Sequence, residues 1–335
     1  MSAAAPLEVR NLTKRFPIGN ALSRSHVHAV DDVSFELRPG TITALVGESG
    51  SGKSTVARLL ARLYDPSGGT VLFEGSDVSL VRRRRDVLRY RSHVQIIFQD
   101  PFASLNPVKT IRHHLERPLR IHGVVPRAQI EERVHELLDT VGLVPPQEVA
   151  AKYPHELSGG QRQRVAIART LAVAPEVVLA DEPTSMLDVS IRIGILNLML
   201  KLKEERGIAF LYVTHDLASA RYLADEILVM YAGQIVERGP VEQVLAEPLH
   251  PYTRLLLAAA PDLANPHPER IEQRKGLASA AVDPPEGCRF VARCPLAIGV
   301  CSKLTPRLVE PQPGHAARCH VTAPALELVV QPPTR

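Results

Sequence analysis

Residues 47–54 are Gly47-Glu48-Ser49-Gly50-Ser51-Gly52-Lys53-Ser54, and they follow an apolar run, Thr41–Val46, that is typical of a buried strand. From Thr55 to Leu63 the apolar residues have helical spacing. A glycine-rich turn between a strand and a helix matches the G-x-x-x-x-G-K-[ST] phosphate loop, and this context disfavours a merely structural turn. The glycines let backbone N–H groups turn toward phosphate oxygens, and the helix N-terminus adds a positive dipole. The stretch therefore predicts a phosphate site in an α/β fold.

The residue types in this loop suit a nucleoside triphosphate and its metal ion. The Lys53 ammonium would reach the β- and γ-phosphates, and the Ser54 hydroxyl would bind Mg²⁺. This stretch therefore predicts a nucleoside triphosphate and Mg²⁺ as ligands. The nucleotide contacts expected from this region are Gly47, Glu48, Ser49, Gly50, Ser51, Gly52, Lys53, Ser54 and Thr55.

A second feature is the run Val177-Val178-Leu179-Ala180-Asp181-Glu182, in which apolar residues end in two acids. A buried strand that ends at Asp181 would bring this carboxylate beside the phosphate loop, where it can hold Mg²⁺ through water. Glu182 would polarise the attacking water. Many strands end in acids, so the pattern gains its weight from the phosphate loop.

Residues 157–161 offer a second set of anion donors, because they precede a predicted helix, Gln161–Val173. Taken alone, Ser-Gly-Gly could be only a helix cap, but here it falls between Gln99 and Asp181. With Leu157-Ser158-Gly159-Gly160-Gln161 the chain resembles the ATP-binding-cassette superfamily, whose signature this is. The resemblance implies that two cassettes enclose two nucleotides, the signature of each covering the γ-phosphate held by the other. The residues expected in this role are Ser158, Gly159, Gly160 and Gln161.

The resemblance also assigns roles outside these motifs. Gln99 would contact Mg²⁺ and relay the nucleotide state to a membrane partner. His215, in Thr214-His215-Asp216, would contact the γ-phosphate and complete a catalytic set with Glu182 and Gln99. Ser185-Met186-Leu187-Asp188 matches the loop that crosses the dimer interface, although Met186 departs from the usual small residue. Phe16 is the candidate for stacking on adenine, with a buried core role as an equal alternative.

Strand and helix signals alternate along most of the chain, which predicts a covered parallel sheet. Further strands are expected at Leu7–Val9, Val33–Leu37, Val94–Phe98, Val177–Ala180, Ala209–Val213, Glu226–Met230 and Gln234–Glu237. A helical pattern from Thr110 to Val141, interrupted near Gly123–Pro126, predicts an inserted helical subdomain at about residues 102–165. The resemblance implies an α/β P-loop NTPase fold with a RecA-like sheet core.

The composition changes after about Pro248, where prolines punctuate a segment with few regular patterns. A helix at Tyr252–Ala260 would open this part. We therefore expect a nucleotide-binding domain over residues 1–250 and a small Pro- and Cys-rich C-terminal domain over residues 251–335.

Narrower features are similar to the ATPases of dipeptide and oligopeptide importers. They are the segments Phe98–Pro107, Tyr153–Glu156 and His250–Thr253. This resemblance implies an ATP-hydrolysing subunit that powers peptide uptake, although relatives in this branch also carry sugars and metal–chelator complexes. The implied partners are two permease subunits, a second, non-identical ATPase subunit and an extracytoplasmic solute-binding protein.

The four cysteines of the chain are Cys288, Cys294, Cys301 and Cys319. Four thiolates are a complete set for tetrahedral Zn²⁺ or for a [4Fe–4S] cluster, and the absence of a paired C-x2-C favours iron–sulfur. The importer branch resembled here has a C-terminal domain of this type, in which some members hold such a cluster. Four unconnected buried thiols are the alternative.

The bulk composition is that of an ordinary soluble protein, with 45% hydrophobic and 23% charged residues. No apolar run approaches the roughly 20 residues that cross a bilayer, and residues 1–10 lack a signal-peptide core. We therefore expect a peripheral protein on the cytoplasmic face of the membrane, held there by its partners.

A soluble cassette that acts on nucleic acid or the ribosome is the rival interpretation. The net charge of +4 is mild, and the basic run Arg82–Arg85 is followed by no aromatic platform, so a solvated face is favoured. The sequence has one cassette, and only a short helical insertion separates Gln99 from Leu157. We therefore expect no nucleic-acid partner.

Overall fold

The computed structural model describes residues 6–18, 25–79, 81–259 and 282–324. Its centre is an eight-stranded sheet in the order β11-β12-β10-β9-β3-β8-β7-β6. Strands β9, β3, β8, β7 and β6 run parallel to one another, and β10 runs antiparallel to β9. The strand bounds are β3 Ile42–Val46, β6 Val94–Ile97, β7 Val177–Asp181, β8 Ala209–Thr214, β9 Glu226–Tyr231, β10 Gln234–Pro240, β11 Val309–Gln312 and β12 His315–Ala317.

The central strands β3, β7 and β8 are buried at every residue, as expected of a parallel sheet covered on both faces. This confirms the predicted α/β fold class with its phosphate-loop sheet core. The strands predicted at Val94–Phe98, Val177–Ala180, Ala209–Val213, Glu226–Met230 and Gln234–Glu237 all occur, with ends shifted by up to three residues.

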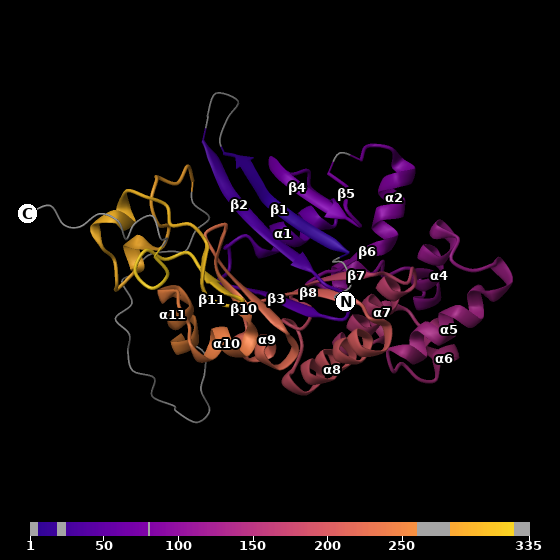
Figure 1. Ribbon diagram of the computed structural model, residues 1–335. Coiled ribbons are helices and arrows are strands. Elements are labelled where there is room, and N and C mark those ends of the chain that lie inside the picture. Colours follow the sequence, from indigo (N-terminus) through magenta and orange to yellow (C-terminus); the bar gives the residue numbers. More distant parts are fainter. Residues whose placement is uncertain (1–5, 19–24, 80, 260–281, 325–335) are drawn as a thin grey trace, which may run out of the picture.

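The N-terminal strands form a separate antiparallel sheet in the order β2-β1-β4-β5. Its strands are β1 Leu7–Pro17, β2 His26–Leu37, β4 Gly68–Phe73 and β5 Ser76–Asp77. The expectation of one parallel sheet is thus wrong for this part, because β1 pairs antiparallel with β2 on one side and with β4, which was not predicted, on the other. Helix α1 (Lys53–Leu60) lies between the two sheets (Figure 1), and its Val56 and Leu59 belong to the core that they share.

Helices cover the opposite face of the central sheet (Figure 1). They are α7 Gly159–Leu171, α8 Val189–Arg206, α9 Leu217–Leu223, α10 Val241–Ala246 and α11 Pro251–Ala259. The predicted helices Gln161–Val173 and Tyr252–Ala260 correspond to α7 and α11, and Ala260 lies outside the described residues.

A group of short helices projects from one end of the sheet, at the right in Figure 1. It consists of α3 Pro101–Ser104, α4 Ile111–His122, α5 Ile130–Thr140 and α6 Pro146–Ala151, with 3-10 turns at Arg127–Gln129 and Pro154–Glu156. The interruption expected near Gly123–Pro126 is present, because Gly123 ends α4 in a left-handed conformation with φ 61°.

Helix α2 (Arg84–His93) begins within the basic run Arg82–Arg85 of the sequence. The side chains from Arg82 to Arg85 and that of Arg89 are exposed, and Arg82 pairs with Asp65 at 3.3 Å. Arg91 instead donates to the Arg62 carbonyl at 2.7 Å. This is the arrangement of a solvated face.

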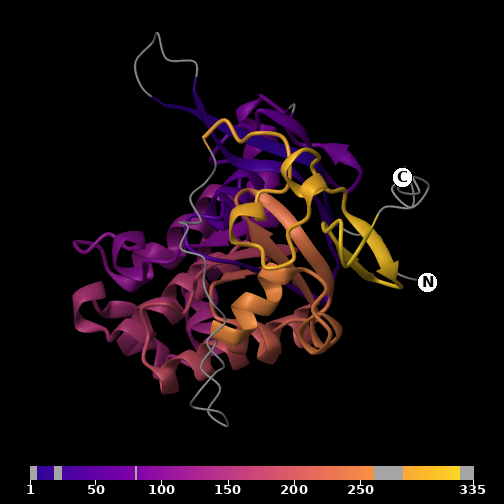
Figure 2. The ribbon, with the colours of Figure 1, turned by 90° about the vertical axis from the view of Figure 1, so that its left-hand side faces the viewer.

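The C-terminal segment, which comprises residues 251–259 and 282–324 of the described chain, packs against β10 and extends the central sheet. Figure 2 shows its later part (yellow) laid across the orange strands, where β12 pairs antiparallel with β10. The other elements of this part are β11 and the 3-10 turns Val291–Arg293 and Gly299–Ser302. Glu237 of β10 is fully buried and accepts bonds from the Leu249 and His250 amides, from Thr253 and, at 2.7 Å, from His315.

No helix within the described ranges is both long enough and apolar enough to span a membrane.

Candidate nucleotide site

The phosphate loop joins β3 to α1, and its glycines are required by close backbone contacts. A Cβ atom on Gly47 would lie 2.2 Å from the Met230 carbonyl oxygen, and one on Gly52 would lie 2.0 Å from that of Ala29. Gly52 also has φ 107°, which L side chains rarely adopt. The loop is thus pressed against the ends of β9 and β2, so that its curvature is set by packing as well as by its own sequence.

Lys53 is buried, and its ammonium lies over the loop that precedes it. Its Nζ donates to the carbonyl oxygens of Gly47 at 2.8 Å and Glu48 at 2.9 Å. Burial lowers the pKa of Lys53, and the carboxylates of Glu182 and Asp181 oppose that shift. The loop therefore holds a positive charge at its centre, where a phosphate group would be attracted.

The carboxyl end of β7 brings an acid to the start of α1. Asp181, the last residue of β7, accepts a hydrogen bond from Ser54 Oγ at 2.8 Å. Burial raises the pKa of Asp181. Hydroxyl and carboxylate oxygens are the donors that Mg²⁺ prefers, so Ser54 and Asp181 fit a magnesium ion at this edge of the sheet.

Glu182 is held by two side chains from other elements. Gln99 Nε2 donates to its Oε2 at 3.0 Å, and His215 Nδ1 lies 3.2 Å from its Oε1. Glu182 has φ 46°, an uncommon conformation for a residue other than glycine, and its amide donates to Val213 O at 2.9 Å. The structure thus brings together the three residues expected to be catalytic.

These residues surround one cavity of about 710 Å³. Its walls come from the phosphate loop, the ends of β1 and β2, the carboxyl ends of central strands and helix α11. The lining residues are Phe16, Ala29, Gly47, Glu48, Ser49, Gly50, Gly52, Lys53, Ser54, Thr55, Gln99, Glu182, His215 and Leu256. A volume of this size is ordinary for a small-molecule or cofactor site.

Phe16 lies in the cavity wall and is half-buried. Its ring meets that of Tyr64 edge-on with centroids 5.6 Å apart, and Lys14 Nζ is 5.1 Å from the ring centroid. The open part of the ring makes Phe16 available for stacking at the edge of the site.

The signature residues lie apart from this cavity. Ser158 is the N-cap of α7 and accepts from the Gln161 amide at 3.2 Å, while Gln161 Oε1 accepts from the Ser158 amide at 2.9 Å. Gly160 packs against Ile191, where a Cβ would meet the side chain at 2.4 Å. None of the residues 158–161 lines the cavity described above. The chain therefore has two helix N-termini of interest, that of α1 at the cavity and that of α7 apart from it.

Asp188 is also absent from the cavity lining, and it begins helix α8 at the surface. Three apolar side chains around it are largely exposed: Met186 at 53%, Val189 at 70% and Ile193 at 49%. A surface of this kind, next to a polar site, is typical of a contact with another protein.

The four cysteines all lie in the C-terminal segment, and none forms a disulfide. Burial raises the pKa of the Cys288 thiol to about 11, and the other three thiols lie near enough to add to the shift. Across the described ranges, no group of three or more His, Cys, Asp or Glu side chains is arranged to hold a metal ion. The predicted iron–sulfur or zinc site is therefore not supported by the geometry of the described residues, although the four thiols lie in one region.

Besides Ala29, which lines the cavity, three residues at the site were not expected from the sequence. Leu256 lines the cavity, the Tyr252 hydroxyl accepts from the Glu48 amide at 2.8 Å, and Arg293 forms an ion pair with the Glu48 carboxylate. Tyr252 and Arg293 belong to segments that resemble the importer branch, but nothing in a linear pattern indicates what they touch.

Comparisons with known proteins agree with this geometry over most of the chain. The family described as "ABC transporter" matches residues 30–185, and the one described as "Oligopeptide/dipeptide transporter, C-terminal region" matches residues 236–301. A "Probable peptide ABC transporter ATP-binding protein" of Sinorhizobium fredii is 44% identical over 332 residues, which cover 98% of this chain and 93% of the relative. An "Oligopeptide transport ATP-binding protein" of Bacillus subtilis is 43% identical, covering 94% of this chain and 97% of the relative.

Solved structures with the same fold include a dimeric bacterial ABC transporter cassette. It is 30% identical with a TM-score of 0.63, and the match covers 70% of this chain and 98% of that chain. A dimeric post-hydrolysis cassette bound to ADP and phosphate matches with a TM-score of 0.62 at 30% identity, over the same shares of the two chains.

Proposed function

This chain belongs to the family of ABC transporter ATP-binding proteins, and from that premise we propose that it hydrolyses ATP to power the import of dipeptides or oligopeptides. The observation that carries the proposal is the cavity in which the phosphate loop, Gln99, Glu182 and His215 meet, with Asp181 bonded to the Ser54 hydroxyl at its edge. The peptide substrate class is supported by the relatives, which are described as peptide and oligopeptide transport proteins. The match of residues 236–301 to the C-terminal region of such transporters supports it further.

Within this cavity, each group has a distinct task in the proposal. The loop amides and Lys53 bind the phosphates, and Phe16 stacks on adenine. Ser54, Gln99 and Asp181 hold Mg²⁺, which supplies neutralisation of phosphate charge when bound. Glu182 orients the attacking water and accepts its proton, because its carboxylate is already held in place by Gln99 and His215.

We propose that the working unit is a dimer of cassettes. Residues 158–161 and Asp188 act on the nucleotide bound by the second ATPase subunit, which we take to be a non-identical chain. This is supported by their separation from the cavity of their own chain and by the exposed apolar side chains at the start of α8. The dimeric form of the similar solved cassettes also favours it.

The remaining partners are two permease subunits and an extracytoplasmic solute-binding protein, with this chain peripheral on the cytoplasmic face of the membrane. The helical subdomain at about residues 102–165 would carry the movement to the permeases. The division into residues 1–250 and 251–335 is part of the same proposal. Limited proteolysis would test it, since a true boundary is cut before either part is degraded.

The four cysteines carry a separate hypothesis of a [4Fe–4S] cluster, with zinc as the alternative. Its support is the number of thiols and their common region, and binding would require them to converge. An absorbance spectrum and metal analysis of anaerobically purified protein test it. A colourless chain with neither iron nor zinc would contradict it.

The proposed function is tested with Glu182→Gln in the chain co-expressed with its permeases. We expect this variant to bind MgATP normally and to lose turnover by ~10²- to 10⁴-fold, the usual contribution of a general base. Phosphate release and nucleotide binding are measured together. Glu176→Gln, which lies just before β7, is the control and should leave turnover unchanged.

Three outcomes would contradict the proposal. Near-normal turnover of Glu182→Gln would show that another residue activates water. Turnover that is stimulated by sugars or metal–chelator complexes but not by peptides would contradict the substrate class. Co-purification with ribosomes or nucleic acid in place of membranes would contradict the transporter assignment altogether.

A further inference from the structure

The C-terminal segment reaches across to the phosphate loop and contacts it at Glu48. Tyr252, at the start of α11, is fully buried, and its hydroxyl accepts a hydrogen bond from the Glu48 amide at 2.8 Å. The next turn of α11 brings Leu256 into the cavity wall. One face of this helix therefore forms part of the nucleotide site, although α11 lies outside the sheet and loop that define the site.

Arg293 holds the Glu48 side chain from a second direction. Its two terminal nitrogens pair with the two carboxylate oxygens at 2.8 and 2.9 Å, which is a bidentate contact. The guanidinium also lies 5.7 Å from the Tyr231 ring centroid and 5.8 Å from that of Phe290. The Arg293 side chain is 13% exposed and that of Glu48 is 30% exposed, so the guanidinium is the better shielded partner. The hydrogen bonds to the Glu48 carboxylate raise the pKa of Arg293 above its ordinary value, because they favour the charged guanidinium.

The backbone of Glu48 is thus fixed at several points. Its amide is held by Tyr252, its carbonyl by Lys53 and its side chain by Arg293. A phosphate-binding loop must keep its amides aimed inward, and ordering a flexible loop at the moment of binding weakens affinity. Contacts that order the loop beforehand favour the ligand.

We propose that Arg293 and Tyr252 are positioning residues for the phosphate loop, so that docking of the C-terminal segment and binding of nucleotide strengthen each other. This rests on the proposed function, because it assigns a further role at the same site. The reciprocity is thermodynamic: a contact that favours the bound loop is in turn favoured by the bound nucleotide.

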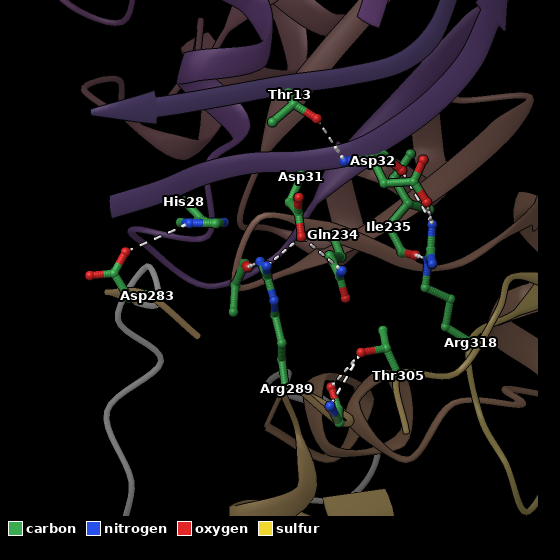
Figure 3. A network of polar contacts seen from close by, with 12 residues as sticks. Thr13, His28, Asp31, Asp32, Gln234, Ile235, Asp283, Arg289, Thr305 and Arg318 are labelled. Atoms are coloured by element: carbon green, nitrogen blue, oxygen red, sulfur yellow. Dashed lines mark hydrogen bonds and ion pairs between the residues drawn. The ribbon is translucent and has the colours of Figure 1, made fainter. Parts of the chain in front are cut away.

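The chain provides a matched control in Arg318. Arg318 directly precedes Cys319, as Arg293 precedes Cys294, and both arginines fasten the C-terminal segment to the rest of the chain. Figure 3 shows Arg318 pairing with Asp32, and its bonds go to the Asp32 carboxylate at 2.7 Å and the Ile235 carbonyl at 3.0 Å. Neither partner belongs to the phosphate loop. Substitution of Arg318 therefore shows how weaker docking of the C-terminal segment affects nucleotide binding when no contact to the phosphate loop is removed.

The experiment measures the dissociation constant of MgATP for the full chain by calorimetry, together with the melting temperature without nucleotide. The variants are Arg293→Gln, Glu48→Ala, the two combined, Tyr252→Phe and Arg318→Gln. We expect Arg293→Gln and Glu48→Ala each to weaken MgATP by about tenfold, as loss of one charge-assisted contact would. Because both break one pair, the combined variant should be no weaker than either alone. Tyr252→Phe should weaken MgATP as well.

Arg318→Gln should lower the melting temperature and leave the dissociation constant within about twofold of the wild type. If Arg293→Gln and Glu48→Ala also stay within about twofold, or if their effects add, the inference is overturned. Glu48→Ala keeps the arginine and breaks the same pair, so it decides the matter if Arg293→Gln does not fold. A wild-type chain that binds MgATP no better than Lys53→Ala would overturn the proposed function itself, and this inference with it.

Discussion

Asp181 is a carboxyl group placed where burial works against its charge. It is 2% exposed at the end of β7, and burial raises its pKa above the ordinary value. The folded state therefore holds a proton at Asp181 more readily than the unfolded state does. The resulting penalty is complete above the folded pKa and disappears as the pH falls through it. The charged carboxylate that would bind a metal ion thus lowers the stability of the folded, metal-free chain.

Replacing this residue should separate stability from ion binding. We expect Asp181→Asn to raise the free energy of unfolding of the nucleotide-free chain at neutral pH, because Ser54 keeps an acceptor and the buried charge is gone. The same variant should weaken Mg²⁺-dependent nucleotide binding by ~10- to 100-fold. Urea unfolding and calorimetry with and without Mg²⁺ measure the two effects.

The exposed Asp139→Asn serves as the control and should change neither quantity. A variant of Asp181 that is less stable than the wild type, yet binds MgATP normally, would show that the carboxylate has a structural role in place of the ionic one.

At the scale of single elements, α7 and α8 begin in different ways. Ser158 caps α7 with a reciprocal pair of hydrogen bonds to Gln161. Asp188 stands at the same position of α8, but its side chain makes no capping bond. Both residues are expected to contact the nucleotide of the partner. Of the two, Ser158 alone also caps a helix within its own chain.

Alanine substitutions should expose this difference. Ser158→Ala should lower the free energy of unfolding by about 1 kcal/mol, the usual value of an N-cap. Asp188→Ala should change it by less than about 0.5 kcal/mol. Both should reduce ATP turnover in the assembled transporter. Chemical denaturation of the isolated chain and turnover of the complex give the two readings, and an equal loss of stability in both variants would contradict the assignment.

On the scale of the whole molecule, the C-terminal segment is joined to the central sheet by a buried polar cluster around Glu237. His250 lies beside this cluster, is 1% exposed, and accepts from the Tyr252 amide through Nδ1 at 3.1 Å. Burial lowers the pKa of His250 to about 3. At a pH between this value and the ordinary pKa of histidine, His250 is therefore protonated in the unfolded chain and neutral in the folded chain.

The sign of the pH dependence follows from that difference. Between pH 6.5 and about 3 the unfolded state holds more protons at His250, so stability falls as the pH falls. From pH 7 to pH 5.5 this residue alone should lower the free energy of unfolding by about 1 kcal/mol. His250→Asn keeps an acceptor without titrating, so it should lose about 1 kcal/mol less than the wild type over this interval. Urea titrations at both pH values test this, and equal losses in the two proteins would contradict it.

Much of the site could be predicted because its parts are local. The strand, turn and helix around the phosphate loop are set by consecutive residues, and the acids at the end of β7 follow from a buried strand that ends in polar residues. The antiparallel sheet was missed for the opposite reason. Its strand β4 contains two glycines and pairs with β1, far away in the sequence, so its own residues carry only a weak strand signal.

The sequence by itself determined the α/β fold class, the nucleotide chemistry and the residues expected to perform it, because these depend on short segments whose geometry is local. Only the tertiary structure decided which distant residues hold the phosphate loop in place. Arg293 and Glu48 are 245 positions apart, and their contact exists because the C-terminal segment packs across the ends of β3 and β9. No periodicity or spacing encodes such a contact, since it depends on how distant surfaces fit together.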